Sequence, residues 1–224
     1  TQFQAQAFNE LLPASGPVRT VVMGKESTSK NQQASRVRQF MNYYITSVME
    51  EYTPDMDQML FYLPLAGSTF KKTYFDETLG RAVSKFVPAE NLVVPYETSD
   101  LETCPNITQV VRMSLNDLRK RQIGGSYLDV EVIPAQKELS DLEGEMDRIE
   151  GLEPNQIDYD CTILECHVDL DLEGYEELDD EGEPTGIKVP YVVTLSEDNG
   201  QVLSIRRNYQ EDDELKRKIQ YFTH

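Results

Sequence analysis

The chain has 224 residues, of which 39% are hydrophobic, and its formal net charge at pH 7 is −19. This length can bury one core or two small ones, and no apolar run approaches the roughly 20 residues that span a bilayer. A protein that grips DNA by neutralising phosphates has a basic surface, so the composition argues against that class. Three cysteines do not form a disulfide framework, and we expect reduced thiols.

The negative charge is concentrated in one segment. Residues 138–183 contain nineteen Asp and Glu and a single basic residue, Arg148. The rest of the chain carries 21 acidic and 20 basic residues and is nearly neutral. This pattern indicates an ordinary globular body with one strongly acidic stretch.

The predicted elements begin with a short helix over residues 2–12, which ends at Pro13. Residues 18–23 are a short β-prone run, and a long helix follows over about 31–52. We expect the apolar stripe of this helix to pack into the core. The stripe consists of Val37, Met41, Tyr44, Ile45 and Val48.

The aromatic residues of this long helix allow a second interpretation. Phe40, Tyr43 and Tyr44 suit a platform on which nucleic-acid bases stack. Apolar residues at helical spacing more often belong to a protein core, so the sequence favours packing over base stacking.

Residues 53–96 predict a helix, a β-hairpin and a third strand. Thr53 is a suitable N-cap, and the helix is expected to bend or end between Pro64 and Gly67. A turn at 76–80 separates two alternating runs, which is typical of a hairpin. The strands are expected over 69–75, 81–87 and 91–94.

The middle of the chain predicts a strand over 107–113 and then a helix over 115–123. Ser114 is a suitable N-cap for that helix, and Gly124-Gly125 is a stop signal. The basic run Arg119-Lys120-Arg121 falls at the end of the helix, where cations oppose the negative end of the helix dipole. A phosphate contact by these residues is the less favoured alternative.

The last third predicts an amphipathic helix over 137–149, a linker over 151–158 and then mostly strands. Residues 161–172 alternate in polarity, with Cys166 on the expected buried face and His167 on the expected exposed face. Asp198-Asn199-Gly200 is a strong hairpin signal. The remaining strands are expected over 186–196, 201–207 and 219–224.

Together these elements predict an α+β fold of mixed helices with antiparallel sheets. We expect an α+β part over residues 1–150 and a mostly β part over residues 151–224. The sequence begins with Thr rather than Met, and residues 219–224 have the pattern of a strand still in progress. We therefore expect both ends to continue in a longer protein.

The acidic segment contains a near match to a calcium-binding loop. An EF-hand loop has oxygen ligands at positions 1, 3, 5, 9 and 12 and glycine at position 6. Here position 5 is Glu, position 12 is the shorter Asp, and a strand precedes the loop, so a solvated loop without metal is favoured. Positions 1, 3, 5, 6, 9 and 12 are Asp169, Asp171, Glu173, Gly174, Glu177 and Asp180.

No arrangement of residues predicts a catalytic or metal site. Cys161, Cys166 and His167 lack the spacing of a zinc knuckle, and neither His167 nor His224 belongs to a nucleophile motif. Gly24-Lys25 lacks the first glycine of a phosphate loop and the hydroxyl directly after lysine. We therefore expect no enzymatic activity, no catalytic residue, no metal and no cofactor.

Five segments resemble one family, in the order in which that family has them. They are 61–72 (FYLPLAGSTFKK) with Tyr74, Asp76 and Gly80-Arg81, then 86–96 (FVPAENLVVPY), 99–105 (SDLETCP), 111–113 (VRM) and 202–208 (VLSIRRN). These segments are similar to the portal (head-to-tail connector) proteins of short-tailed bacteriophages. The similarity extends from about residue 36 over nearly the whole chain and is more specific than any single short motif.

The resemblance implies a non-enzymatic structural protein of the virion, assembled in the host cytoplasm. Twelve copies would form a ring at one capsid vertex, through which DNA passes without sequence specificity during packaging and ejection. Implied partners are other copies of the chain and the capsid and scaffolding proteins, with no membrane. The chain is similar to the amino-terminal wing portion, so the stem and clip regions, with the contacts to terminase and tail adaptor, are expected beyond residue 224.

A different class of function stays open because of the acidic loop. The β half of the chain is also compatible with an acidic calcium-binding or adhesion module. Calcium titration separates the two, because micromolar binding that is lost on Asp169→Ala would favour the module. A hydrolase is a third alternative, but it needs a site that the sequence does not show.

Overall fold

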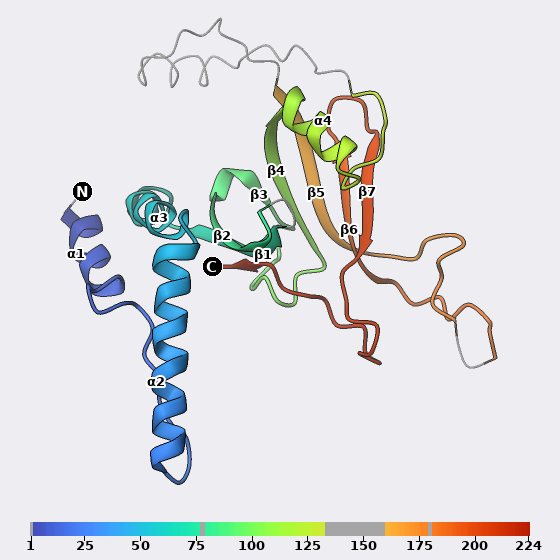
Figure 1. The fold of residues 1–224 in the computed structure, drawn as a ribbon. Coiled ribbons are helices and arrows are strands. Elements are labelled where there is room, and N and C mark those ends of the chain that lie inside the picture. The colour runs from blue at the N-terminus through green and yellow to red at the C-terminus, as the bar shows by residue number, and fades with distance from the viewer. Residues whose placement is uncertain (1, 77–78, 133–159, 179–180) are drawn as a thin grey trace, which may run out of the picture. The chain divides into compact units, whose positions relative to one another are not determined.

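The computed structural model describes residues 2–76, 79–132, 160–178 and 181–224, and it has an α+β fold (Figure 1). Its helices combine with two antiparallel sheets, one of three strands and one of five, so the predicted fold class is confirmed. Within these ranges, no helix is long and apolar enough to cross a membrane. The predicted helix over 137–149 and the linker over 151–158 lie outside the described residues.

The chain forms two compact units, which divide it differently from the ranges that the sequence suggested. The first unit is Thr1–Glu90 with Gln220–His224, and the second is Asn91–Ile219. A strand before residue 133 and a strand after residue 159 pair side by side over nine residues in one sheet, so the second unit continues across the predicted boundary near residue 150. The boundary residue itself lies outside the described ranges.

Helices and a small sheet make up the first unit. Its long helix begins after Ser27, whose side-chain oxygen accepts a hydrogen bond from the backbone N–H of Lys30 at 3.3 Å. This cap explains why the helix begins three residues before the predicted start. The elements are α1 (Gln2–Leu11), α2 (Thr28–Tyr43), the π-helical turn η1 (Tyr44–Val48), α3 (Tyr52–Ala66), β1 (Thr69–Asp76), β2 (Arg81–Pro88) and β8 (Phe222–Thr223).

The predicted helix over 31–52 is divided in the structure. After η1, Met49 leaves the helical region with φ −85° and ψ 78°, and the chain starts α3 at Tyr52. Residues 18–23, predicted to be β-prone, form no strand and instead lie along α2, as described below.

The end of α3 follows the predicted signal. Gly67 has φ +76°, a left-handed conformation that only glycine adopts without cost, and its N–H donates to the carbonyl of Leu63 at 2.9 Å. Pro64 lies inside the last turn, and the helix ends at Ala66. Beyond it, β1 and β2 form the predicted hairpin, and β8 pairs with Lys71 and Lys72 of β1, which gives the strand order β2-β1-β8.

The second unit is built on a five-stranded sheet of order β3-β4-β5-β6-β7. Ser114 ends one strand and caps the following helix as predicted, because its hydroxyl oxygen accepts a hydrogen bond from the N–H of Asp117 at 3.1 Å. The turn at Asp198-Asn199-Gly200 also joins two strands as predicted. The elements are β3 (Leu92–Val93), β4 (Asn106–Ser114), α4 (Leu115–Ile123), β5 (Asp160–Leu170), β6 (Val189–Ser196) and β7 (Val202–Arg207).

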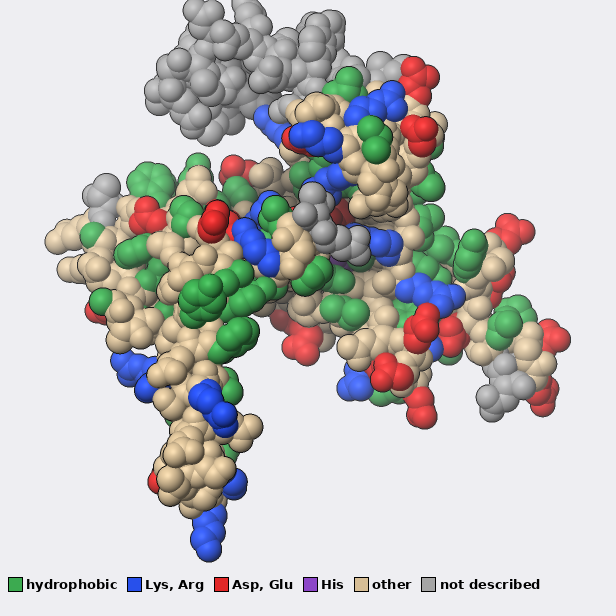
Figure 2. Space-filling view, in the orientation of Figure 1, with side chains coloured by type: hydrophobic (Ala, Val, Ile, Leu, Met, Phe, Trp, Pro, Cys, Tyr) green, Lys and Arg blue, Asp and Glu red, His purple; other side chains and the backbone are tan. Residues whose placement is uncertain are grey.

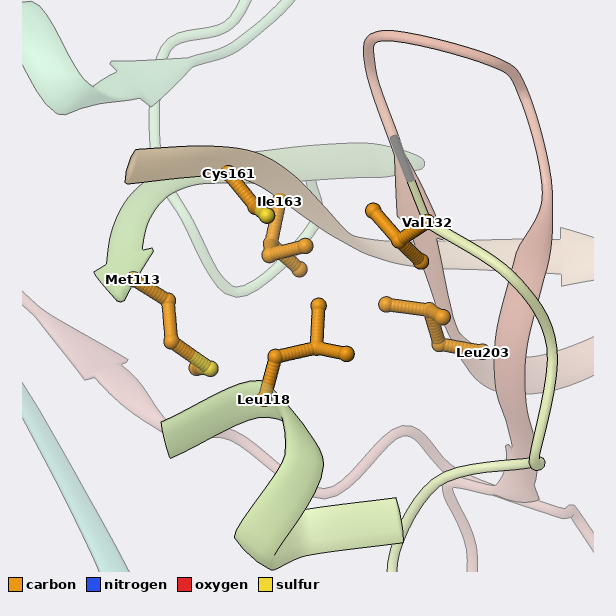
Figure 3. Packing of buried hydrophobic residues seen from close by; sticks show 6 residues of the cluster. All are labelled: Met113, Leu118, Val132, Cys161, Ile163 and Leu203. Atoms are coloured by element: carbon orange, nitrogen blue, oxygen red, sulfur yellow. The ribbon is translucent and has the colours of Figure 1, made fainter. Parts of the chain in front are cut away.

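The main core of the second unit lies between α4 and one face of the sheet. Leu118 of α4 points at side chains from β4, β5 and β7, and Val132 closes the cluster from the segment after α4 (Figure 3). The buried members are Met113, Leu118, Val132, Cys161, Ile163 and Leu203.

The predicted orientation of β5 is wrong. His167 is only 3% exposed and lies on the face that carries Cys161 and Ile163, whereas Cys166 on the opposite face is half-buried. Both faces of this strand carry apolar residues, so its alternation does not say which face a helix covers. Packing of α4 against the face with Cys161 and Ile163 decides the question.

Candidate interaction surface

The residues that first suggested chemistry have structural partners. The His167 imidazole Nε2 is 2.7 Å from a carboxylate oxygen of Glu165, and both side chains are largely buried on the covered face of the sheet. Cys166 belongs to the other face, so it does not meet His167 at a common site. Cys104 is buried, with its sulfur 3.4 Å from the hydroxyl of Thr98. This arrangement holds no exposed nucleophile beside a base.

The acidic loop after β5 does not gather its carboxylates. Asp169 lies in the β5–β6 ladder opposite Pro190, and Glu177 forms an ion pair with Lys216 at 3.6 Å. Gly174 has φ +82°, as a tight turn requires. Asp180 lies outside the described residues, and in the ranges that the structure describes no three potential ligands come together as a metal site.

The basic run at the end of α4 is held by local contacts. Lys120 lies 3.2 Å from Asp117 and Arg119 lies 3.5 Å from Asp129. The guanidinium of Arg121 lies over the ring of Tyr127, 5.5 Å from its centroid. These contacts and the helix dipole account for the run without a phosphate ligand.

The most unusual surface of the described residues is on α2, because this 16-residue helix has no buried residue. Val37 is 48% exposed, and Phe40 and Tyr43 are each 60% exposed. The sequence predicted that the stripe of this helix packs into the core, and for its first half this is wrong. Only the later residues of the stripe, in η1, are half-buried. The reason is visible in Figure 1, where α2 extends away from the other helices and the sheet of its unit.

Positive charge accompanies these apolar side chains. Between Thr28 and Tyr43 the helix carries Lys30, Arg36 and Arg38 and no acidic residue. Blue side chains accordingly lie along this helix in the space-filling view (Figure 2). We call the following residues the α2 surface: Lys30, Arg36, Val37, Arg38, Phe40, Met41 and Tyr43.

One side of α2 is covered by the chain that precedes it. The side-chain oxygen of Asn42 accepts a hydrogen bond from the N–H of Val18 at 2.8 Å, and its nitrogen donates to the Val18 carbonyl at 3.2 Å. The Thr20 hydroxyl donates to the carbonyl of Ala34 at 3.1 Å. Gly16, with φ +92°, begins this contact because a Cβ there would lie 2.4 Å from the side chain of Asn42. The covering segment leaves the α2 surface open.

The connection from α2 to α3 is fixed to β2 by side chains that accept hydrogen bonds from the strand. Tyr44, Glu51 and Asp55 accept from the backbone N–H groups of residues 82, 84 and 86 at 3.1, 3.2 and 2.8 Å. Because β2 is an edge strand, these alternate N–H groups face away from β1 and would otherwise be unpaired. Tyr44 directly follows α2, so its bond holds the end of that helix next to β2, whereas Glu51 and Asp55 hold the start of α3.

Glu51 has a second partner in this contact, Arg81, at 2.7 Å. Burial alone would raise the pKa of the Glu51 carboxyl, but hydrogen bonds from backbone N–H groups and from Arg81 outweigh it and leave the pKa below its usual value of 4.5. The carboxylate is therefore charged at neutral pH, when it binds both the strand and the arginine.

The arrangement thus offers a surface for binding rather than a site for a reaction. An exposed apolar stripe with basic neighbours, on a helix anchored at its base, is typical of a protein-binding helix. Comparison of the chain with models of protein families and with curated proteins found no match.

Proposed function

We propose that this chain is the wing portion of a phage portal protein, a subunit of a ring through which viral DNA is packaged and ejected and which joins head to tail. The proposal starts from the resemblance of five ordered segments between residues 61 and 208. It describes a passive structural component of the virion, assembled in the host cytoplasm, with no reaction of its own.

Several residues of these segments have roles in the fold, and this supports a shared architecture rather than a shared chemistry. Gly67 ends α3, and the Asp100 carboxylate accepts hydrogen bonds from both the N–H and the hydroxyl of Thr103 at 2.7 Å. Asn208, at the end of the last segment, is fully buried. Residues with such roles are expected to recur wherever the same fold recurs.

The observation that carries the proposal is the α2 surface. A subunit of a large ring needs extensive contacts with its neighbours, and a helix that exposes apolar side chains and buries none is suited to supply them. The partners in this proposal are other copies of the chain, capsid and scaffolding proteins, and, through regions outside these residues, terminase and tail adaptor.

The charge distribution agrees with a conduit that does not retain DNA. The first unit carries nine acidic and nine basic residues, and the second carries 31 acidic and 12 basic residues. DNA can slide along a neutral or acidic surface because that surface does not attract its phosphates. A basic lining would bind the phosphates and hold the DNA.

Native mass spectrometry of the polypeptide as its gene encodes it tests the proposal. We expect one closed oligomer of fixed copy number, with twelve as the number that the resemblance implies. A stable monomer or dimer at all concentrations would overturn the proposed function. Oligomers of every size without a preferred closed state would overturn it as well.

A further inference from the structure

The second unit has a surface that complements the α2 surface in charge. It is formed by two segments of the chain. The first consists of residues 171–178 and 181–187, and the second consists of residues 209–219. Together these residues include ten acidic and three basic side chains. They also include large apolar side chains that are exposed to solvent. These are Tyr175, Leu178, Ile187, Leu215 and Ile219. We call these two segments the acidic end.

The two segments of the acidic end are joined to each other. Lys216 forms an ion pair with Glu177 at 3.6 Å, which links the later segment to the earlier one. Tyr209 also packs with Val189 and Tyr191 in a buried cluster, and Leu172 packs against this cluster. The ion pair places the two segments next to each other, and red side chains mark this part of the molecule on the right of Figure 2.

Within the later segment, Asp213 organises the turn. Its carboxylate accepts hydrogen bonds from the side chain of Arg217 at 3.0 and 3.2 Å and from the N–H groups of Leu215 and Arg217. These bonds lower the pKa of Asp213 to about 2, first through the Arg217 side chain. A shallow hollow of about 400 Å³ lies at the same place, lined by Gln210, Asp212, Asp213, Arg217 and Ile219.

We propose that the α2 surface of one copy of this chain binds the acidic end of another copy. The inference rests on the proposed function and names the surfaces by which neighbouring subunits meet. Val37, Phe40 and Met41 would pack on the exposed apolar side chains of the acidic end, while Lys30, Arg36 and Arg38 would face its carboxylates. Each copy contributes a different surface to this contact, so the interface is heterologous. Such an interface repeats from copy to copy and builds a ring or a filament.

Charge and shape favour a second copy over nucleic acid as the partner. The acidic end supplies ten carboxylates on the same polypeptide as the three basic residues of α2. Val37 and Met41 are four residues apart and therefore lie on the same face of the helix. Partner proteins bind amphipathic helices through apolar side chains with this spacing. The net charge of −19 also means that the chain as a whole repels a polyanion such as DNA.

Complementation between two variants tests this contact. Val37→Ser with Phe40→Ser removes two central apolar side chains of the α2 surface, and Tyr175→Ser with Leu215→Ser removes the two most exposed apolar side chains of the acidic end. Neither pair changes the net charge, and all four side chains are exposed, so folding should be retained. Tyr96→Ser with Ile123→Ser is the matched control, because both residues are exposed and lie outside the two surfaces.

Sedimentation of the 224-residue chain at concentrations up to about 1 mM, where weak contacts are populated, gives the readout. We expect the wild type and the control to associate weakly and without a fixed limit, and each variant alone to remain monomeric. A mixture of the two variants retains one intact pair of surfaces and should form only heterodimers. A wild type that does not associate overturns the inference, and so does a mixture of variants that stays monomeric.

A photo-crosslinking residue at position 40, in a mixture of isotopically light and heavy chains, locates the contact. Crosslinks between light and heavy chains should fall in the acidic end, at residues 171–178, 181–187 and 209–219. Crosslinks from α2 to α2, or tighter binding of a DNA duplex than of a second copy, would overturn the inference. If the native protein forms a ring but the crosslinks fall elsewhere, the contact is refuted and the proposed function is not. If the crosslinks fall as expected but the copies form open filaments and no ring, only the proposed function is refuted.

Discussion

The carboxylate of Glu51 holds Ser84 and Arg81 at once, with one oxygen 3.2 Å from the N–H of Ser84 and the other 2.7 Å from the guanidinium of Arg81. Tyr44 and Asp55 make equivalent bonds to the strand on either side. The three acceptors satisfy alternate N–H groups of an edge strand and protect it from pairing with another chain. The bonds of Glu51 and Asp55 hold the start of α3 on the strand, and the bond of Tyr44 holds the end of α2 there.

Removing the Glu51 carboxylate should destabilise the first unit. In Glu51→Ala the buried N–H of Ser84 loses its acceptor, and leaving such a donor unpaired costs about 1–3 kcal/mol. Urea unfolding measures this loss, and Glu50→Ala, an exposed neighbour of the same type, is the matched control with an expected change within about 0.5 kcal/mol. Equal effects of the two substitutions would show that the contact with β2 does not stabilise the unit.

Because of Lys71, the free energy of unfolding of the first unit should depend on pH in the alkaline range. Its ammonium group lies over the ring of Tyr52, 3.8 Å from the centroid, and burial lowers the pKa of Lys71 below 10.5 although Asp55 and Glu51 partly oppose this. Between the lowered pKa and 10.5 the unfolded chain binds more protons at this site than the folded one, so the free energy of unfolding rises with pH. The rise is present in the wild type and absent in Lys71→Met, as urea unfolding between pH 7 and 10.5 can measure. Parallel pH profiles of the two proteins would contradict the assignment.

Gly16→Ala should detach residues 16–23 from α2. The added Cβ would lie 2.4 Å from the Asn42 side chain and would also require φ +92°, and such strain costs on the order of 1–3 kcal/mol. Hydrogen exchange of the Val18 amide, which donates to Asn42, should accelerate. Gly24→Ala is the control because Gly24 also has positive φ but has open space around it. Unchanged exchange at Val18 in Gly16→Ala would mean that the close approach is not required.

Calcium titration separates the proposed function from an acidic calcium-binding module. Calorimetry should show no micromolar binding, because Asp169 belongs to a strand and Glu177 is paired with Lys216. Asp169→Ala should then leave the titration unchanged. Micromolar binding that this substitution abolishes would favour the calcium module instead.

The 224-residue chain alone should be a monomer or associate only weakly. In the proposed ring the stem helices supply much of the contact between subunits, and the α2 surface and the acidic end supply the rest. Analytical ultracentrifugation at micromolar concentration checks this expectation. A stable ring of twelve copies formed by this chain by itself would contradict it.

Local signals in the sequence predicted much of the fold, because they act over a few residues. Ser114 caps α4, Gly67 ends α3, and Asp198-Asn199-Gly200 joins β6 to β7 where predicted. Each of these residues caps a helix, ends a helix or forms a turn, and these roles depend on the neighbouring backbone rather than on the rest of the fold.

The misplaced features depend on contacts between distant residues. The orientation of His167 was wrong because α4 covers one of two apolar faces of β5. The pairing of β4 with β5, which keeps residues 91–219 in one unit, bridges segments that no local pattern connects.

The sequence also failed to predict that the apolar stripe of α2 is exposed. The period of Val37, Met41 and Tyr44 predicted a buried stripe, and periodicity gives the same signal for a face that packs in the core and for a face that awaits another chain. Lys30, Arg36 and Arg38 without any acidic residue on the helix were the available signal that it meets a negatively charged surface.

Electron microscopy of the polypeptide as its gene encodes it tests the central claim most directly. We predict closed rings with a central opening wide enough for double-stranded DNA, and with these 224 residues placed around the opening in every subunit. Particles without a central opening would contradict the account.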